Sequence, residues 1–341
     1  MAQVFKGDIE MTKITFLEPK TQRFLDDLAA RGGRKPVHTL SPADARKSLE
    51  ELQFAGMDIR DLQIEERILP VGPSGAVSVS IFRPNKGGEP LPVAVYFHGG
   101  GWVLGNLKTH GRLACELARA SGAAFVFVHY ASAPEAQFPV ANEQAYAVVR
   151  FIAEHGSALG LDGGRMAVVG DSVGGNMVAA VTLLAKERGG PQIRYQVLCY
   201  PVTDSSMTQN SYADYGTGPW LTRQAMEWYW GHYAPNVNDR KKALAAPLLA
   251  TPEQLEGLPP ALVLVAEHDL LRDEGEEYAR KLAQAGVEVT AVRYLSTFHG
   301  FMMLDALAET PAAKGAIELV SQRLRQVLGT SAIERAPTIS K

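Results

Sequence analysis

The stretch Met166-Ala-Val-Val-Gly-Asp-Ser172-Val-Gly-Gly-Asn176 sets how the rest of the sequence is interpreted. It starts as a short apolar run, typical of a buried strand, and leads into Met177–Ala185, an apolar run rich in Ala and Leu that is typical of a helix. Between them, Gly170–Gly174 matches G-x-S-x-G, which predicts that Ser172 lies at a sharp strand-to-helix turn. Glycines relieve backbone crowding in such a turn, and the helix N-terminus directs partial positive charge towards the serine. The stretch therefore indicates a nucleophilic serine, with an ordinary glycine-rich turn as the alternative for this motif alone.

The composition is that of a globular protein with nearly balanced charge. Of the 341 residues, 46% are hydrophobic and 21% are charged, and the net charge is -3. The sequence has neither a basic field nor a polybasic run. Nucleic acid and an anionic membrane surface are therefore not favoured as partners. No apolar run approaches the roughly 18 residues of a membrane span. These features disfavour nucleic-acid-binding and membrane-spanning classes of protein.

The cysteines and the N-terminus predict a cytoplasmic protein. Cys115 and Cys199 belong to no C-x-x-C pair, so metal and redox sites are disfavoured. Buried free thiols are expected instead, and these suit a reducing compartment. Met1–Glu10 has scattered charges and no apolar core, so it does not match a secretory signal.

The expected elements follow a regular order after a helical N-terminal segment. Helices are predicted at 19–30 and after Ser41, a helix N-cap that is followed by Pro42 at the first helical position. Two antiparallel strands come next, and strands then alternate with helices except over 203–249, an aromatic-rich segment with one expected helix capped by Thr222. The expected strands are 63–69, 76–83, 92–97, 124–128, 165–169, 195–200, 261–266 and 288–294, and the helices among them are 109–120, 140–155, 173–188, 273–285 and 311–328.

This order predicts an α/β fold with about eight strands in one mostly parallel sheet, flanked by helices. The core of the fold is expected in two parts, 61–203 and 251–328. Residues 1–60 precede it and residues 204–250 interrupt it, because neither segment follows the alternation. The polar tail, 329–341, is expected to fray.

An activated serine needs a base, and the base needs a carboxylate that orients it. Downstream of Ser172, Glu267-His268-Asp269 follows one predicted strand and His299 follows the next. The carboxyl ends of parallel strands meet at one edge of the sheet, where ligands bind, so both groups are expected beside Ser172. The chain order of serine, acid and histidine favours Ser172, Asp269 and His299. Asp273 and Glu267 are the alternatives for the acid, and His268 is interpreted as structural.

A second signal, Phe97-His98-Gly-Gly-Gly101-Trp102, follows the expected buried strand 92–97. Three consecutive glycines allow backbone N–H groups to turn inward without steric conflict, an arrangement that can bind a developing oxyanion. A glycine hairpin turn with His98 at the surface is the alternative interpretation. A dinucleotide site is disfavoured because no G-x-G-x-x-G follows the first strand.

Together these motifs resemble the hormone-sensitive-lipase-like group of α/β-hydrolase esterases. The resemblance runs from about residue 60 to 325 and rests on four motifs, HGGGW at 98–102, GDSVGGN at 170–176, Ala133-Pro134-Glu135 with Phe138-Pro139, and Phe298-His299-Gly300-Phe301. It implies an α/β-hydrolase fold with a helical cap made of 1–60 and 204–250, and Ser172, Asp269 and His299 as catalytic residues. It also implies an oxyanion hole made by the amides of Gly100, Gly101 and Val173, and a homodimer formed through Glu288–Leu328.

The substrate pocket is expected to include Trp102, Asp171, Trp220 and Phe301. The aromatic segment 212–233 is expected either to pack in the core or to cover this pocket. Val173 stands where the resembled family usually has Ala, beside the serine, and is expected to narrow the acyl site and favour short acyl chains. After the fourth strand, His129-Tyr-Ala-Ser132 replaces the usual Asp-Tyr-Arg-Leu, so any ion pair that these residues make in relatives is absent.

The sequence thus predicts a serine carboxylesterase that hydrolyses small short-chain acyl esters through an acyl-enzyme, with no metal or cofactor. An amidase that uses the same three residues is the main alternative, because the sequence does not separate ester from amide hydrolysis. A ligand-binding protein on the same scaffold is a further alternative. The plant gibberellin receptors are similar in their fold motifs but lack the catalytic histidine, which is present here as His299.

Overall fold

The computed structural model describes residues 14–53, 56–84 and 90–331. Within them, eight strands form one sheet with the order β1-β2-β4-β3-β5-β6-β7-β8. β2 pairs antiparallel with β1 and β4 and all other neighbours are parallel, which confirms the mostly parallel sheet predicted from the sequence. The strands are β1 (Leu62–Leu69), β2 (Val77–Pro84), β3 (Leu91–Phe97), β4 (Ala124–His129), β5 (Leu161–Asp171), β6 (Tyr195–Cys199), β7 (Ala261–His268) and β8 (Val289–Phe298).

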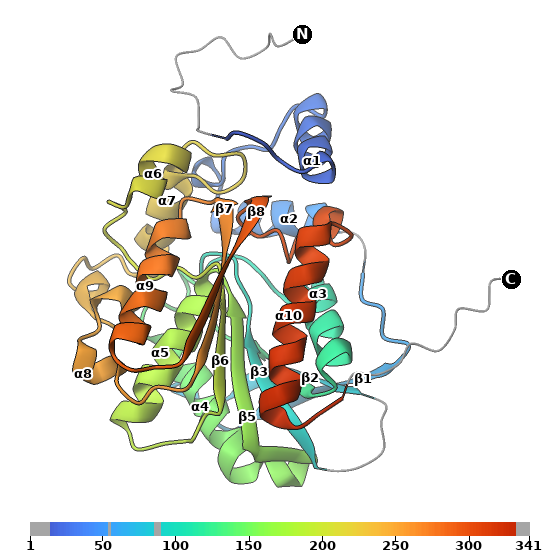
Figure 1. Ribbon diagram of the computed structural model, residues 1–341, viewed down its shortest axis with the longest axis vertical. Helices are drawn as coiled ribbons and strands as arrows, with labels where there is room; N and C mark the ends of the chain where they lie inside the picture. Colours follow the sequence, from blue (N-terminus) through green and yellow to red (C-terminus); the bar gives the residue numbers. More distant parts are fainter. Residues whose placement is uncertain (1–13, 54–55, 85–89, 332–341) are drawn as a thin grey trace, which may run out of the picture.

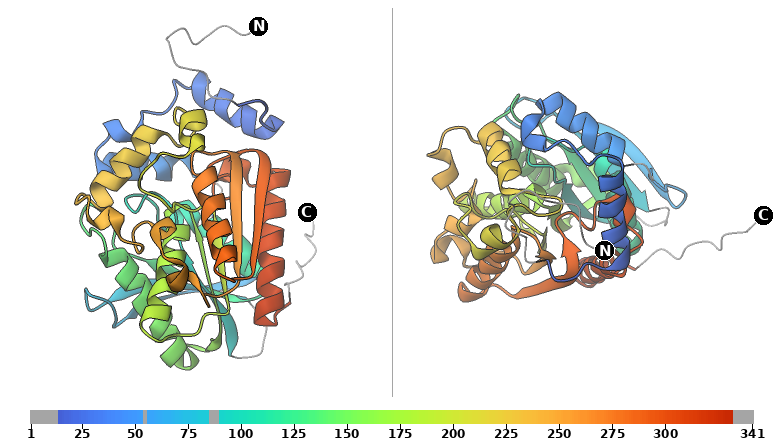
Figure 2. Two further views of the ribbon diagram at one scale, coloured as in Figure 1. Left: turned by 60° about the vertical axis from the view of Figure 1, so that its left-hand side comes forward. Right: turned by 90° about the horizontal axis from the view of Figure 1, so that it is seen from above.

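Helices cover both faces of the sheet (Figures 1 and 2). α3 (Leu107–Ser121) and α10 (Pro311–Leu328) pack against each other on one face. The other face is covered by α4 (Val140–His155), α5 (Val173–Glu187) and α9 (Arg272–Gln284), and the short α8 (Pro252–Leu255) contacts the last two of these. This two-sided arrangement follows from the alternation of strands and helices, because each helix must bury its apolar face on the sheet.

Four further helices lie beyond the carboxyl ends of the strands, at the top of Figure 1. They are α1 (Pro19–Ala30), α2 (Pro42–Leu52), α6 (Asn210–Tyr215) and α7 (Arg223–Tyr233). The predicted caps are present, since the Ser41 side chain accepts a hydrogen bond from the Asp44 amide and the Thr222 side chain accepts one from the Ala225 amide. Helices from both segments outside the alternation therefore lie at the ligand-binding edge of the sheet.

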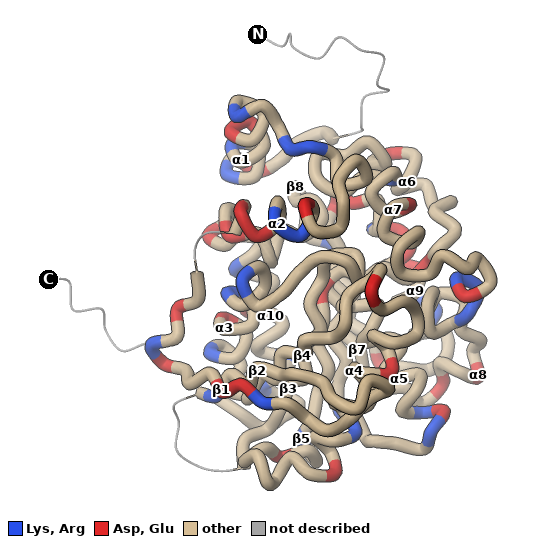
Figure 3. Tube along the Cα trace, turned by 180° about the vertical axis from the view of Figure 1, so that it is seen from behind, with Lys and Arg blue, Asp and Glu red and all other residues tan. Residues whose placement is uncertain are grey.

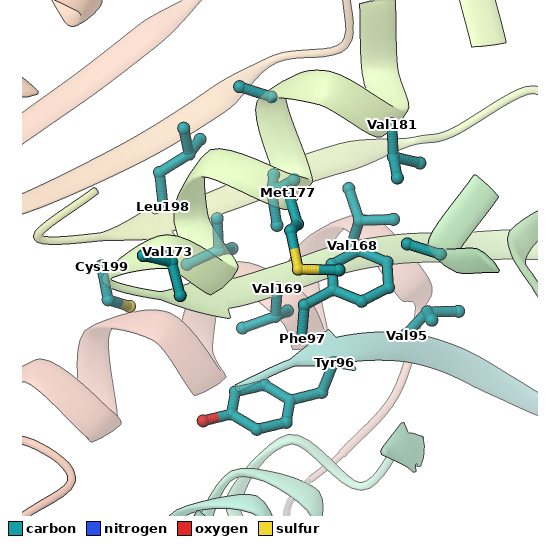
Figure 4. Close-up of a cluster of buried hydrophobic side chains, with 14 of the residues drawn as sticks. Val95, Tyr96, Phe97, Val168, Val169, Val173, Met177, Val181, Leu198 and Cys199 are labelled. Carbon is teal, nitrogen blue, oxygen red and sulfur yellow. The ribbon is translucent and has the colours of Figure 1, made fainter. Parts of the chain in front are cut away.

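A cluster of buried hydrophobic side chains lies where β3, β5 and β6 meet α5, the helix that follows Ser172 (Figure 4). Apolar side chains of all four elements interlock there, and none is more than 2% exposed: Val95, Tyr96, Phe97, Val168, Val169, Val173, Met177, Val181, Leu198 and Cys199. Full burial of a side chain of this size stabilises the fold by about 1.5–3 kcal/mol relative to its exposure. The backbone that carries Ser172 is thus held by packing on both faces of β5.

β8 is longer than the sequence predicts, and the reason is a bulge. The pairing of β7 with β8 shifts register between Ala266 and His268, and Ser296 has a φ of 61°. The Ser296 amide donates a hydrogen bond to Glu267 Oε2 (2.7 Å) instead of to the ladder. The predicted strand end at Tyr294 lies just before this bulge, but pairing resumes and carries β8 to Phe298. His299 therefore follows the strand directly.

Charged residues of both signs are interspersed over the molecule (Figure 3). No helix in the described ranges has the length and apolar character that a membrane crossing requires. Cys115 and Cys199 are buried free cysteines, as the sequence predicts. The predictions made for Met1–Glu10 and for most of the tail, 332–341, lie outside the described residues.

Candidate active site

Ser172 lies at the turn between β5 and α5 in a strained backbone conformation. Its φ is 56° and its ψ is -120°, which a non-glycine residue adopts only when its surroundings enforce it. The enforcement comes from close backbone packing, because a Cβ on Gly174 would collide with the Phe97 carbonyl oxygen and one on Gly170 would collide with the Gly174 backbone. The Ser172 amide also donates to the Cys199 carbonyl oxygen (2.8 Å). The turn thus presents the hydroxyl at the carboxyl edge of the sheet, as the motif predicts.

Asp269 follows the end of β7, and His299 follows the end of the neighbouring strand β8. Both side chains reach towards Ser172. His299 Nε2 lies 2.9 Å from Ser172 Oγ, and His299 Nδ1 lies 2.7 Å from Asp269 Oδ2. Asp269 Oδ1 accepts a hydrogen bond from the Leu271 amide (3.0 Å), so the carboxylate is fixed before it orients the ring. All three residues are buried. The structure brings together the three residues that the sequence favours, in the order acid, imidazole and hydroxyl.

The alternative acids are engaged elsewhere. Asp273 accepts hydrogen bonds from the Ser211 amide (2.8 Å) and from Arg272 Nε (2.8 Å). Glu267 holds the β8 bulge through the Ser296 amide. His268 Nε2 lies 2.8 Å from the Phe16 carbonyl oxygen, so its ring ties the N-terminal segment to the sheet edge, in keeping with a structural interpretation.

The glycine turn after β3 has backbone amides without a partner among the described residues. Gly100 and Gly101 have φ values of 111° and 66°, and a Cβ on Gly101 would collide with the Tyr229 ring. In the part of the chain that the structure describes, the amides of Gly100, Gly101 and Val173 donate to no acceptor. All three residues line the same cavity as Ser172 and His299. Unpaired N–H groups beside a hydroxyl are what a site that binds an oxyanion needs.

Asp171 ties the glycine turn to the serine turn. Its Oδ1 accepts hydrogen bonds from the Gly99 amide (3.0 Å) and from the Tyr96 hydroxyl (2.6 Å), and its Oδ2 lies 3.6 Å from His110 Nε2. Burial alone would raise the pKa of Asp171, but His110 and the Tyr96 hydroxyl outweigh it and hold the pKa below its ordinary value. The neighbouring imidazole of His98 is neutral, because burial and the proximity of His110 lower its pKa to about 3. Asp171 is therefore an ionised acceptor that fixes the turn.

Two partners in this network, Tyr96 and His110, are not predicted from the sequence. Tyr96 reads as one more apolar residue of a buried strand, and His110 lies inside an amphipathic helix, so neither stands out by pattern. His98, for which a surface position was the alternative, is buried and packs between Tyr130 and Phe127. A hydroxyl one residue before the end of an otherwise apolar strand is the signal that could have identified Tyr96.

A cavity of about 940 Å³ lies over Ser172. Its floor is formed by the serine, His299 and the glycine turn. Its cover comes from both segments outside the alternation, including Leu25, Arg34, Leu49, Trp220 and Tyr229. Asp171 and Trp220, two of the residues expected in the substrate pocket, line this cavity. The aromatic segment 212–233 contributes to the core and also to the cover of the cavity. Trp230 and Tyr233 are fully buried, while Trp220 lines the cavity.

The other two predicted pocket residues, Trp102 and Phe301, lie in the core and do not line the cavity. Trp102 has a φ of 59°, which turns its indole away from the serine and onto Tyr233, with a distance of 3.9 Å between ring centroids. Phe301 is 1% exposed and packs against Tyr200 and Tyr294. For Trp102, the backbone at the turn, rather than proximity in sequence to the glycines, sets the direction of the side chain.

The chain is similar to known alpha/beta hydrolases and esterases. A family model described as alpha/beta hydrolase fold matches residues 94–303. Carboxylic ester hydrolase LipN of Mycobacterium tuberculosis is 40% identical over 272 residues, which cover 78% of this chain and 69% of that protein. Ethyl acetate hydrolase of Pseudomonas putida is 36% identical over 298 residues, which cover 86% and 92% of the two chains. The crystal structure of a thermostable esterase from Pseudomonas putida superposes with a TM-score of 0.89 at 45% identity and covers 92% of this chain and 98% of that chain.

The match to the family model covers more than half of the chain, and the thermostable esterase has the same fold. The fold expected from the sequence is confirmed by the sheet order and by these comparisons. The protein belongs to the alpha/beta-hydrolase family, in its hormone-sensitive-lipase-like group of carboxylesterases, and is a carboxylic ester hydrolase.

Proposed function

We propose that the chain hydrolyses short-chain carboxylic esters through a covalent acyl-enzyme on Ser172. The observation that carries this proposal is the continuous path from Asp269 through His299 to the Ser172 hydroxyl, at 2.7 and 2.9 Å. A serine hydroxyl is a weak nucleophile unless an adjacent base takes its proton. We assign the imidazole proton to Nδ1, which donates a hydrogen bond to Asp269. Nε2 of His299 is then free to accept the Ser172 proton.

In the first half-reaction, Ser172 Oγ attacks the acyl carbon as His299 Nε2 takes its proton. The carbonyl oxygen becomes an oxyanion, and the amides of Gly100, Gly101 and Val173 are placed to donate to it. One such donor is worth about 10²–10³ in rate. The bond to the alcohol oxygen then breaks, and the alcohol leaves with the proton held on His299.

In the second half-reaction, His299 takes a proton from water, and the resulting hydroxide attacks the acyl carbon of the ester on Ser172. The same amides hold the second oxyanion. The bond between the acyl carbon and Ser172 Oγ breaks, the carboxylic acid leaves, and Ser172 regains a proton from His299. Asp269 orients the imidazole and stabilises its charged form in both steps. Every proton is returned, so this proposal routes no step through a metal or a cofactor.

The proposal that short acyl chains are preferred rests on the cover of the cavity. Residues 14–53 and 204–250 act as a cap in this account, and their side chains limit the space above the serine. Val173 is fully buried beside Ser172, and the Tyr229 ring packs directly on Gly101. One relative, from Pseudomonas putida, is named for the hydrolysis of ethyl acetate, the ester of a two-carbon acid.

The test is the initial rate on p-nitrophenyl esters of increasing acyl length, for the wild type and the Ser172→Ala variant. We expect a rate that peaks between acetyl and hexanoyl and falls by on the order of 10⁵–10⁶ in the variant. A rate that survives in clean Ser172→Ala protein would contradict the nucleophile. Matched amides belong in the same experiment, because faster turnover of amides than of esters would favour an amidase.

We also propose that two copies associate through Glu288–Leu328. β8 is an edge strand, and Leu295 on it is 64% exposed. Light scattering on the purified protein tests this, and a monomer at all concentrations would contradict it. A cytoplasmic location is proposed because Cys115 and Cys199 are free thiols. Recovery of the protein from an oxidising compartment would overturn that location.

A further inference from the structure

The partly buried side chain of Arg34 faces the substrate cavity with no ion-pair partner among the described residues. Arg34 lies in the segment between α1 and α2 and lines the cavity together with Ser172. Its guanidinium carbon is 4.5 Å from the centroid of the Trp220 ring. Its Nε is buried and has no hydrogen-bond partner, and among the described residues no carboxylate lies within ion-pair distance of it. An arginine that has lost part of its hydration without gaining an anion carries a cost that a bound anion offsets.

The acidic groups that share the cavity with Arg34 are already engaged. Asp171 accepts from the Gly99 amide and the Tyr96 hydroxyl on the floor. Asp26 is exposed and accepts from Gln22 Nε2 (2.9 Å). The other arginine of the lining, Arg223, donates to the Met207 carbonyl oxygen (2.9 Å) and lies over the Tyr212 ring. The third cation of the lining, Lys35, is exposed. Among the described residues of the lining, Arg34 is therefore the cation that combines a buried donor without a partner with a contact to an aromatic ring.

The two rings beside Arg34 connect it to the reacting groups. Trp220 lies against Gly300, the residue after His299. A Cβ added to Gly300 would lie 3.6 Å from the indole nitrogen of Trp220. The second ring, Tyr229, packs directly on Gly101 of the glycine turn. Tyr229 lines the same cavity as Arg34, and the Arg34 charge partly offsets the effect of burial, which raises the pKa of Tyr229 to about 12. A substrate whose ester sits between His299 and Gly101 would extend along these rings towards the guanidinium.

We propose that Arg34 binds a carboxylate of the substrate, so that the preferred esters carry an anionic group on the acyl or the alcohol side. The planar guanidinium matches a carboxylate in a two-point hydrogen bond, and the Trp220 face holds it in place. This inference rests on the proposed function and names its substrate class. The anion is recognised at the cap, away from the reacting bond, and so it selects substrates without changing the chemistry on Ser172.

The test compares anionic esters with neutral esters of the same carbon chain. On the acyl side, the pair is mono(4-nitrophenyl) glutarate and 4-nitrophenyl pentanoate. On the alcohol side, the pair is 3-(4-acetoxyphenyl)propanoate and its primary amide. We expect kcat/KM to favour the anionic member by roughly 10- to 100-fold on one side, the range that a charge-assisted hydrogen bond supplies. The side that shows the preference identifies where the carboxylate belongs.

Three variants locate the preference. Arg34→Met keeps the aliphatic stem on Trp220 and removes the charge, so the ratio of anionic to neutral kcat/KM should fall to near one. Arg34→Lys keeps the charge but lacks the planar guanidinium that can donate two parallel hydrogen bonds. This variant should retain part of the ratio. Arg31→Met removes an exposed arginine of the same segment that does not line the cavity, and should leave the ratio unchanged.

Calorimetric binding of the same four esters to the Ser172→Ala protein, with and without Arg34→Met, separates this inference from the proposed function. Tighter binding of an anionic ester that Arg34→Met abolishes supports the inference even if the wild type turns over no ester. In that case, it is the proposed function that fails. Equal binding and equal kcat/KM for both members of both pairs, or a preference that survives in Arg34→Met, would overturn the inference.

Discussion

The floor and the cap of the cavity are held by different kinds of interaction. The floor, made of the glycine turn, Ser172, Asp269 and His299, depends on strained backbone and short hydrogen bonds between buried groups. The cap, 14–53 and 204–250, depends on side-chain contacts. Phe24 of α1 packs against Trp220 at 6.0 Å and against Phe298 at 6.4 Å between ring centroids, and Arg46 of α2 binds carbonyl oxygens of the core. The contrast indicates that damage to the floor slows the chemical step, while damage to the cap weakens substrate binding.

The largest effect in the floor after loss of the serine is expected for Gly101→Ala. The φ of 66° disfavours any other residue, and the new Cβ would collide with the Tyr229 ring, so the turn must move. Displaced amides no longer meet the oxyanion, and kcat should fall by about 10²–10³ on p-nitrophenyl acetate, with a much smaller change in KM. Gly231→Ala in α7, where a Cβ meets nothing within 4 Å, is the matched control and should keep full activity. Equal kcat in both variants would contradict an oxyanion site at this turn.

The next effect is expected for Asp171→Ala, which removes the acceptor of the Gly99 amide. The glycine turn would then be free to shift by a fraction of an ångström, and kcat should fall by about 10- to 100-fold. Asp171→Asn keeps an oxygen in the place of Oδ1 and should recover most of the loss. Steady-state kinetics on both variants, after circular dichroism shows that they fold, decide the point. An Asn variant as slow as the Ala variant would show that the charge beside His110, and not the hydrogen bond to Gly99, matters.

A cap variant should show the opposite kinetic signature. Arg46 Nε donates to the Val103 carbonyl oxygen (2.8 Å), and its guanidinium binds Glu135 through two hydrogen bonds of 2.6 and 2.8 Å. Arg46→Met should raise KM several-fold with little change in kcat, and should lower the free energy of unfolding by about 1 kcal/mol. Lys47→Met, an exposed change on the same helix, should alter neither quantity. A fall in kcat at unchanged KM for Arg46→Met would break the division between floor and cap.

The smallest effect is expected on the pH dependence of the free energy of unfolding, through a residue at the junction of the floor and the cap. Glu274 is fully buried in the first turn of α9 and accepts from the Thr203 and Asp204 amides, where the 204–250 insertion leaves the sheet. Burial raises its pKa well above the ordinary value of 4.5, and the two amides only partly offset this. A raised carboxyl pKa means that Glu274 favours the fold below pH 4.5 and that this contribution is lost as pH rises through the folded-state pKa.

Glu274→Gln cannot ionise, so its stability relative to the wild type should improve between pH 5 and pH 8. Urea unfolding at the two pH values measures this difference. A parallel pH dependence of the two proteins would show that the carboxyl of Glu274 is not perturbed in the fold.

Most of the floor could be predicted from the sequence, because its chemistry restricts residue types. Only glycine fits at 101 and 174, and a serine between glycines after a buried strand has few structural interpretations. Chain order and strand ends then placed Asp269 and His299 before any distance was known. The β8 bulge at Ser296 was not predictable, because its cause is the Glu267 carboxylate of a neighbouring strand.

The cap could be delimited from the sequence but not described. Its limits follow from the absence of strand periodicity, whereas the direction of each side chain depends on tertiary contacts. Trp102, expected in the pocket, turns into the core because of its positive φ. The role proposed for Arg34 could not be predicted from the sequence, because an arginine in a polar loop is common. Only the structure shows that Trp220, almost two hundred residues away in the sequence, lies beneath its guanidinium.

The most direct test of the account is the mass of the enzyme during turnover. The protein is mixed with p-nitrophenyl acetate, quenched in acid within the first turnovers, digested and analysed by mass spectrometry. We predict one acetyl group on the peptide that contains Ser172, its absence from the Ser172→Ala protein, and its disappearance once the substrate is exhausted. An acetyl group on another residue, or turnover with no acetylated enzyme at any quench time, would contradict catalysis through an acyl-enzyme on Ser172.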